Sequence, residues 1–472
     1  MKHTLERELK LEPGAGFVLP ELGGEAQPTR VFISTYHDTE DLVLARNGLT
    51  LRHRVEAGTG LWQLKLPNGD GARIELEVPG TPARPPFELL ALLVGFLRGR
   101  DVAPVARLRT RRNVVLTDGA EIVDDAVSVM QGQRVVSRFR EVEVELLEDA
   151  DVSTLHGLEK KLRRAGASTG EGRPKLFRVL GLDGPEPPEA VPAGAPPSVA
   201  LGIALGEQAR RILVHDPGTR LGSDPEELHQ MRVATRRLRA FLRAGGKSLD
   251  RQWASSLRDE LAWLGRALGP ARDLDVLVEY LSAEIESVGA DAEAGASLIA
   301  GLEAERAAAR RDVVEALSSD RYLELLDRLD GVSRPELSGN EKPLADRWRK
   351  AWKRARKSLS ALDEDSPDEE LHEARIDLKR ARYAAELAAH ELGADGARFA
   401  KAASKLQDVL GAHQDAFVAE QRIRAWADDL SGDAASAAAE SLIARQRQRR
   451  RQSRAALPDA LTTVRRIAKQ LG

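Results

Sequence analysis

A proline-rich segment near the middle of the chain limits most strongly how the chain can fold. Residues 182–198, LDGPEPPEAVPAGAPPS, hold six prolines in 17 positions. Proline fixes φ and donates no backbone hydrogen bond, so this segment cannot continue a helix or a sheet and predicts an extended linker. The 472 residues therefore predict two separately folded parts, 1–182 and 199–472, joined by a linker over 183–198.

The part before the linker shows short runs in which apolar and polar residues alternate. These runs read LERELKL, LTLRHRVEA, GLWQLKLP, ARIELEVP, RNVVLTDG, AEIVDDAVSV and REVEVELLE. Turn sequences such as PNGDG at 67–71 separate them. Alternation of period two broken by turns predicts an antiparallel sheet, with short helices near 85–99 and 151–165.

The polar faces of these runs carry almost only Glu and Arg. A sheet with one solvated side explains a single strand of this kind, but a solvated face should also mix in Lys, Thr, Ser and Gln. We therefore expect the strands to close into a tunnel with the charged faces inward and helices over the apolar faces. Clustered carboxylates hold a hard cation such as Mg²⁺ or Mn²⁺, and guanidinium groups bind phosphate oxygens. The combination suits a polyanion that carries its own metal.

The part after the linker has helical periodicity and repeats itself. LHQMRVATRRLR at 228–239 returns as LHEARIDLKRAR at 371–382, and LGPARD at 268–273 returns as LGAHQD at 410–415. The constant offset predicts a duplicated bundle of about four helices, with copies over 199–335 and 340–472 and a seam near 331–342. The whole chain is thus expected to be an α+β multidomain protein.

The repeated motif carries a basic face. His229, Arg232 and Arg236 fall, together with Arg239, within an arc of about 80° on a helix. A solvated face, a capping cluster and a lone histidine metal ligand are alternatives, but random surface charge has no reason to recur at fixed spacing. Arginine repels cations, so a linear polyanion fits better than a metal.

Two further segments of the second part are basic. The helix expected at 344–359 has one basic stripe, and the run 445–454 adds charge that a solvated helix face would equally explain.

The low aromatic content bears on which polyanion these basic residues bind. Aromatic residues make up only 4% of the chain, whereas binding to single-stranded nucleic acid commonly stacks bases on aromatic rings. A phosphate chain without bases is favoured, and no specific nucleic acid is expected.

The first part resembles the CYTH domain family, the triphosphate tunnel metalloenzymes. The resemblance is carried by Glu6-x-Glu8-x-Lys10, then YHDTEDLVLARNGLTLRHR at 36–54, WQLKLP, ARIELEVP and VEVELLE in that order. It implies an antiparallel eight-stranded β-tunnel that hydrolyses triphosphate compounds with a divalent metal, Mg²⁺ or Mn²⁺.

The resemblance also implies roles for individual residues. The expected metal residues are Glu6, Glu8, Asp125, Glu143 and Glu145, with Asp125 preferred over Asp124 because it shares a strand face with Glu121. Glu6 and Glu8 also count as catalytic, together with Lys10 and Lys65. The expected substrate-binding residues are Arg52, Arg54, Arg73, Lys175, and Arg109 or Arg111.

The second part resembles the CHAD domain, a conserved-histidine α-helical domain of two pseudo-symmetric four-helix bundles. The match rests on the repeated motif and on RDLD at 272–275, with Lys379 and Gln414 as departures where the first copy has Arg236 and Arg272. The resemblance implies binding of inorganic polyphosphate. The expected residues are His229, Arg232, Arg236, Arg237, Arg239, His372, Arg375, Lys379, Arg380 and Arg382.

Composition sets the remaining expectations. The absence of cysteine excludes disulfides, thiolate nucleophiles and Cys-ligated metal centres, so any metal must be held by other ligands. Without a visible signal sequence or membrane segment, a cytoplasmic protein is expected, with association with polyphosphate granules as an option. The leading hypothesis is an inorganic triphosphatase with a polyphosphate-binding module. A nucleotide triphosphatase, a class IV adenylyl cyclase or a non-catalytic polyphosphate-binding protein are alternatives, and the oligomeric state stays open.

Overall fold

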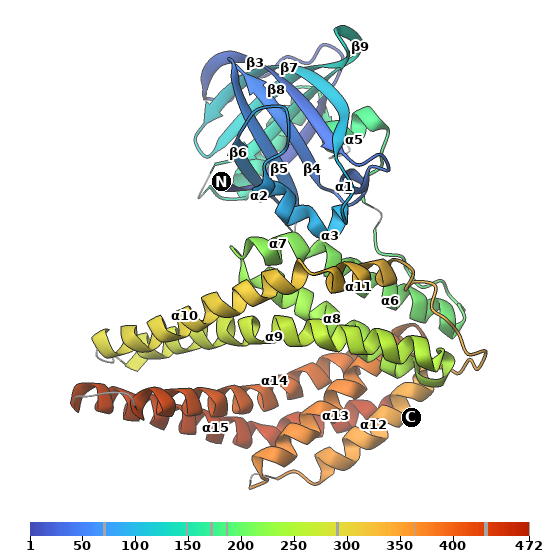
Figure 1. The fold of residues 1–472 in the computed structure, drawn as a ribbon, viewed down its shortest axis with the longest axis vertical. Coiled ribbons are helices and arrows are strands. Elements are labelled where there is room, and N and C mark those ends of the chain that lie inside the picture. The colour runs from blue at the N-terminus through green and yellow to red at the C-terminus, as the bar shows by residue number, and fades with distance from the viewer. Residues whose placement is uncertain are drawn as a thin grey trace. The chain divides into compact units, whose positions relative to one another are not determined.

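The computed structural model comprises two compact units, Met1–Pro187 and Pro188–Gly472, whose boundary falls inside the expected linker (Figure 1). It describes residues 1–472 except 69–71, 148–149, 170–172, 186, 289–291, 364, 429–432 and 472. Among the described residues, no helix is both long and apolar enough to span a membrane.

The first unit is one antiparallel sheet of ten strands in the order β1-β6-β5-β4-β3-β7-β8-β9-β2-β10. The strands are β1 (Lys2–Glu6), β2 (Glu8–Pro13), β3 (Glu25–Asp38), β4 (Thr50–Glu56), β5 (Thr59–Asn68), β6 (Ala72–Pro79), β7 (Ala103–Thr117), β8 (Ala120–Gln131), β9 (Arg134–Leu146) and β10 (Ala167–Thr169). The expected number was eight. The structure has ten because the first strand is interrupted at Arg7 and the short β10 is added.

The interruption at Arg7 closes the sheet. β1 pairs with β6 on one edge, and β2 pairs with β9 on the other. The Arg7 carbonyl accepts a 2.9 Å hydrogen bond from the Leu146 amide, so the chain stays in the ladder as it passes from one edge to the other. β1 and β2 together therefore act as one strand that joins both edges, which makes the expected tunnel.

Apolar side chains on the outer face of the tunnel pack under helices. Leu158 and Leu162 of α4 (Ser153–Arg164) pack against Ile122 and Val144 of the sheet. The short segments α1 (Val43–Arg46), α2 (Phe87–Leu90), η1 (Ala91–Leu93) and α3 (Val94–Leu97) complete this unit. In contrast, α5 (Lys175–Leu180) lies on the inner side, where its Phe177 packs among inward residues of β3, β7 and β8.

The second unit is helical, and each copy of the repeat supplies four long helices. The first copy contains α6 (Pro197–Val214), α7 (Asp216–Leu221), α8 (Pro225–Gly245), η2 (Gly246–Ser248), α9 (Arg251–Val288), α10 (Ala292–Leu317) and α11 (Asp320–Asp330). The second contains α12 (Leu344–Ser360), α13 (Asp368–Leu387), α14 (Ala389–Asp428), α15 (Asp433–Ala468) and η3 (Lys469–Leu471). The expected fold class, a β-tunnel followed by two helical bundles, is confirmed.

Each bundle has an apolar interior, and the two repeated motifs meet. Leu238 and Leu261 are fully buried in the first bundle. In the second, the rings of Trp348 and Trp352 lie edge-on to Phe399, with centroids 5.3 and 5.2 Å away. α8 packs against α13, so the two basic faces predicted from the repeat come from neighbouring helices.

Candidate functional sites

Three carboxylates from the two edges of the sheet meet inside the tunnel. Glu6 ends β1, Glu8 begins β2, and Glu145 lies opposite Glu8 on β9. One oxygen from each lies within 4.8 Å of the others. Carboxylate oxygens are the ligands that Mg²⁺ and Mn²⁺ prefer, and three at this spacing could hold such an ion, with water or substrate oxygens completing its coordination.

The protonation of this acidic cluster shows that it has too little positive charge nearby. Burial and the adjacent Glu143 raise the pKa of Glu145 to about 7. Burial, together with Glu8 and Glu75, also raises the pKa of Glu6. Burial likewise disfavours the charge of Glu8, but Lys10, Lys65 and Arg73 together outweigh it and lower the pKa of that group. A divalent cation would neutralise the excess negative charge.

Asp125 and Glu143, predicted as metal residues, stand apart from this cluster because cations already hold them. Arg112 donates to both oxygens of Asp125, at 2.9 and 2.8 Å, and Lys175 Nζ lies 3.0 Å from the same carboxylate. Glu143 contacts Lys10 Nζ and lies 2.9 Å from Lys175 Nζ. These cations hold the pKa of Glu143 well below its ordinary value despite burial.

The strand register shows which of Asp124 and Asp125 faces into the tunnel. Asp125 faces inward and is fully buried. Asp124 faces the other way and accepts hydrogen bonds from Arg140 at 2.7 and 2.8 Å. The prediction that Asp125 is the inward carboxylate therefore agrees with the structure, although its partners are cationic side chains.

The strands next to β1, namely β6, β5 and β4, carry the expected cations. Arg52 donates to Gln63 at 2.8 Å and to the Tyr36 hydroxyl at 3.2 Å. Lys65 donates to Glu6. Arg73 pairs with Glu6 in the strand register and therefore shares its face. These cations border the acidic cluster, where a phosphate chain with a metal would need them.

Arg54 lies in the same tunnel over an aromatic ring. Its guanidinium carbon is 3.8 Å from the centroid of Phe32, and the side chain donates to Glu56. Burial and the neighbouring Arg52 lower its pKa to about 10. Two guanidinium groups that repel each other in a buried space favour an anion between them.

The prediction that Arg109 or Arg111 binds substrate in the tunnel is wrong. Both side chains are exposed, and the strand register places them on the outer face of β7. Arg112 is the inward residue, and its nearby carboxylates raise its pKa. The chain has arginine at positions of both parities here, so alternation alone could not decide which one faces inward.

Three inward residues of the tunnel were not predicted from the sequence. Arg112, Tyr36 and Gln63 all bond to expected site residues. Arg112 could have been found from its place next to Arg111. Tyr36 and Gln63 carried no signal beyond strand parity, because neutral polar residues are ordinary on any sheet face.

In the second unit, basic residues of the two repeats converge between α8 and α13. The pKa of Lys379 falls to about 8 because burial and the charges of Arg375, Arg236, Arg382 and Arg232 disfavour its ammonium form. Lys379 and Arg375 lie on α13, whereas Arg232 and Arg236 lie on α8. We name this set, with Arg272 of α9 and His229, the basic groove; the charge of Arg272 contributes to a lowered pKa of His229.

Glycines let the groove arginines lie against the long helices. A Cβ at Gly411 of α14 would stand 3.3 Å from Arg375 Nη2, and a Cβ at Gly269 of α9 would stand 3.9 Å from Arg232 Nη2. The two glycines occupy equivalent positions of the repeat. The duplicated sequence therefore repeats a glycine beside each arginine, and of the two positions only Gly411 would crowd its arginine if it carried a Cβ.

A second group of arginines extends the positive charge along α8. Arg239, Arg258, Arg354 and Arg380 all lower the pKa of Arg243, with burial as the largest cause. Arg243 and Arg258 were not predicted, because Arg258 lies in another helix and no repeated motif includes either. Asp377 moderates this group, through Arg354 at 3.0 Å and Arg380 at 2.7 Å.

Other predicted basic residues have structural partners or lie apart. Arg237 is 3.2 Å from Glu386, which also lies 3.3 Å from Arg382, and His372 is exposed. In the run 445–454, carboxylates pair with several arginines. Arg449 lies 2.6 Å from the buried Glu284 of α9. This run therefore connects helices, which is neither the added phosphate-binding charge nor the solvated helix face that the sequence suggested.

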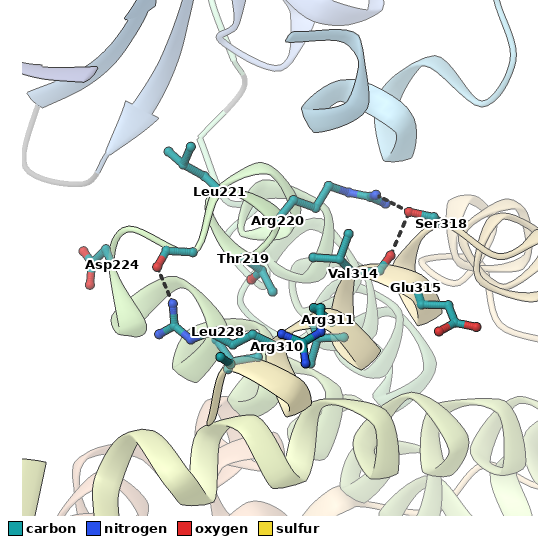
Figure 2. A pocket seen from close by; sticks show the side chains of 13 residues that line it. Thr219, Arg220, Leu221, Asp224, Leu228, Arg310, Arg311, Val314, Glu315 and Ser318 are labelled. Atoms are coloured by element: carbon teal, nitrogen blue, oxygen red, sulfur yellow. Dashed lines mark hydrogen bonds between the residues drawn. The ribbon is translucent and has the colours of Figure 1, made fainter. Parts of the chain in front are cut away.

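A cavity of about 500 Å³ lies elsewhere in the second unit, between α7, the start of α8 and the end of α10 (Figure 2). Two of its three arginines are engaged by the protein. Arg220 donates to the Leu317 carbonyl at 2.6 Å and to Ser318 at 3.2 Å, and Arg310 donates to the Gly222 carbonyl and to Asp275. No residue predicted to bind phosphate lines it.

Comparisons with known proteins agree with this division. The family model of the CYTH domain matches residues 4–176, and that of the CHAD domain matches residues 203–424. Uncharacterised proteins from two strains of Mycobacterium tuberculosis are each 31% identical over 461 residues, covering 89% of this chain and 88% of the relative.

Solved structures also resemble the chain. The CHAD domain of the plant Ricinus communis has 30% identity and a TM-score of 0.47, covering 58% of this chain and 95% of that domain. PptA from Streptomyces chartreusis has 23% identity and a TM-score of 0.48, covering 57% of this chain and all of PptA.

Proposed function

The chain belongs to the proteins that join a CYTH domain to a CHAD domain, and from this premise we propose that it is a metal-dependent inorganic triphosphatase with a polyphosphate-binding module. The observation that carries the enzyme proposal is the meeting of Glu6, Glu8 and Glu145 inside a tunnel whose adjacent strands carry cations. Triphosphate is favoured over a nucleotide because no described residue of the tunnel forms an evident pocket for a base.

The acidic cluster fits Mg²⁺ or Mn²⁺ by its oxygen donors and its excess negative charge. Such an ion would supply charge neutralisation at the transferred phosphoryl group. Arg52, Arg54 and Arg73 bind the phosphate oxygens and hold the chain in line with the attacking water. An oxygen of the acidic cluster that is not bound to the ion accepts a hydrogen bond from this water. No covalent intermediate is needed.

Before substrate binds, the tunnel cations are paired with its carboxylates. Lys65 pairs with Glu6, and Lys10 with Glu143. Binding of a metal-bearing polyanion exchanges these internal pairs for new ones, so charge balance inside the tunnel is kept. Metal and phosphate chain should therefore bind with positive coupling.

The helical module is proposed to hold polyphosphate in the basic groove. The carrying observation is that arginines of both repeats crowd around Lys379 and lower its pKa to about 8. A linear polyanion would offset their mutual repulsion.

Phosphate release tests the enzyme proposal. The purified chain is given triphosphate, ATP and long-chain polyphosphate, each with Mg²⁺, with Mn²⁺ and with EDTA. We expect metal-dependent release, fastest from triphosphate, and its loss in Glu6→Gln and Glu8→Gln. Glu88→Gln, an exposed glutamate on α2, serves as the control and should leave turnover unchanged. Absence of metal-dependent release from all three substrates would refute the proposal, and faster turnover of ATP would favour a nucleotide substrate.

Titration calorimetry with long-chain polyphosphate tests the groove. Replacing Arg232 and Arg375 by Gln should weaken binding at least about tenfold, because two half-buried guanidinium–phosphate pairs are lost. The charge-matched control replaces the exposed Arg251 and Arg356. Equal affinity of the two double variants would contradict a ligand in the groove.

A further inference from the structure

The outer face of the tunnel carries an arginine cluster that the proposed reaction does not use. We name it the outer arginine patch, and its members are Arg107, Arg109, Arg111 and Arg138. All four side chains are exposed. Among the residues that the structure describes, no carboxylate pairs with any of the four.

The strand register orders these arginines in two rows. Arg109 on β7 lies opposite Ser128 on β8, which lies opposite Arg138 on β9. Arg111 lies opposite Ala126 in the same way. Neighbouring strands are about 4.8 Å apart, so the rows stand roughly 10 Å apart, and successive outward residues of one strand are about 7 Å apart. The small side chains of β8 leave a lane between the rows.

The charge of this lane is unbalanced. Asp124 is the acid on the same face of β8, and Arg140 holds it with both guanidinium arms. Four arginines without a paired carboxylate give this face a positive potential, which favours an anionic ligand. Two parallel rows of guanidinium groups match a linear anion whose charges repeat along its length.

The neighbouring side chains argue for an anion without bases. The outward residues next to Arg109 and Arg111 on β3 are Ile33 and Val31, and no aromatic ring stands outward beside them. Phe139 belongs to the opposite face, in register with Val127. Phe17, the aromatic ring beside Arg140 on this face, is buried under the Arg140 guanidinium, so among the described residues no exposed ring next to the patch is available for the stacking of bases that single-stranded nucleic acid generally uses.

We propose that the outer arginine patch is a second binding site of the first unit, which holds long-chain inorganic polyphosphate along β8. The choice of ligand class rests on the proposed function. The site itself rests on the register and the missing counter-charges. Triphosphate, which the tunnel accommodates, needs no contact with the patch, so the patch discriminates long chains from short ones.

The test uses the full-length chain in which Arg232 and Arg375 are replaced by Gln, so that the basic groove is weakened. In this background, Arg109→Gln with Arg138→Gln is compared with a charge-matched control, Lys160→Gln with Arg164→Gln on α4, where both residues are exposed. Binding of long-chain polyphosphate is measured by fluorescence anisotropy at several salt concentrations, beside turnover of triphosphate.

The patch variant should bind polyphosphate about tenfold more weakly than the control, since each exposed pair contributes a factor of roughly three. The slope of log Kd against log salt should fall by about two. Turnover of triphosphate should be unchanged. Equal affinity and slope in both variants would overturn the proposal, as would a larger loss for single-stranded RNA of equal charge. If no protein hydrolyses triphosphate while the patch variant still loses polyphosphate binding, the proposed reaction fails and the patch stands.

Discussion

Replacing Glu145 by Gln should stabilise the metal-free first unit and at the same time weaken its hold on metal. Burial and Glu143 raise the pKa of Glu145 from its ordinary 4.5 to about 7. A difference of this size corresponds to about 3 kcal/mol at most by which the ionised carboxylate destabilises the folded unit. No hydrogen bond of Glu145 is lost on substitution, because among the described residues its side chain has no bonded partner.

The sign depends on pH. A carboxylate whose folded pKa is raised contributes stability below the unfolded pKa and loses it as pH rises through the folded value. The wild type should therefore lose stability between about pH 4.5 and pH 7, whereas Glu145→Gln should not. At pH 8 we expect the variant to be more stable by about 1–3 kcal/mol, and at pH 4.5 the difference should vanish.

Hydrogen–deuterium exchange of peptides from β2 and β9 gives the free energy of opening for this unit alone. It is measured at several pH values, with EDTA and with Mg²⁺. Mg²⁺ should protect the wild type and protect Glu145→Gln much less. Lower protection of the variant in EDTA at pH 8, or equal protection of both by Mg²⁺, would refute the reasoning.

Asp125→Asn should destabilise the first unit, whereas Glu145→Gln should stabilise it. Asp125 is fully buried between Arg112 and Lys175, so loss of its charge leaves two buried cations with one partner fewer. Breaking a buried ion pair in this way costs about 3 kcal/mol. Exchange of the same peptides should therefore rise, and a stabilised Asp125→Asn would show that its cations find other partners.

Three further outcomes follow from the geometry. Arg109→Gln with Arg111→Gln should leave kcat and KM for triphosphate within about twofold, since both side chains face outward; a large loss would place one in the tunnel. Lys379 has a pKa of about 8, and a bound polyanion raises that pKa. Polyphosphate binding therefore takes up a proton, and the affinity should fall above pH 8 by up to about tenfold per pH unit. Lys379→Arg should remove this dependence, as calorimetry at pH 7, 8 and 9 would show. Gly411→Ala should displace the Arg375 guanidinium, 3.3 Å from the new Cβ, and weaken polyphosphate binding about threefold while stabilising α14 by about 1 kcal/mol; unchanged affinity would mean that Arg375 adjusts freely.

Alternation and turn sequences predicted the closed sheet and most of its inward charges, because side-chain direction in a strand depends only on parity. On β7 alternation alone could not predict which arginine enters the tunnel, because arginines occupy both faces: Arg109 and Arg111 face outward and Arg112 faces inward. The bulges between β3 and β7 set the register there, and they depend on pairing with a distant segment.

The partners of the charged side chains could not be predicted, for a related reason. A strand face says which residues enter the tunnel but not which of them meet across it. Glu145 met Glu6 and Glu8, whereas Glu143, two residues away, met Lys10 and Lys175. In the helices, the internal repeat predicted the convergence of α8 and α13. The repeat could not predict the arginine group around Arg243, because its neighbours Arg258 and Arg354 come from helices outside the repeated motif.

The split of the first strand at Arg7 has a consequence for folding. Glu6 pairs with Arg73 on one side of the split, and Glu8 pairs with Glu145 on the other, so the site depends on two separate pairings between residues far apart in the chain. Long-range pairings form late, since the entropy of loop closure must be overcome first. We therefore expect metal affinity to be the last property gained during refolding, so that Mg²⁺ binding would report completion of the barrel more faithfully than the recovery of sheet structure does.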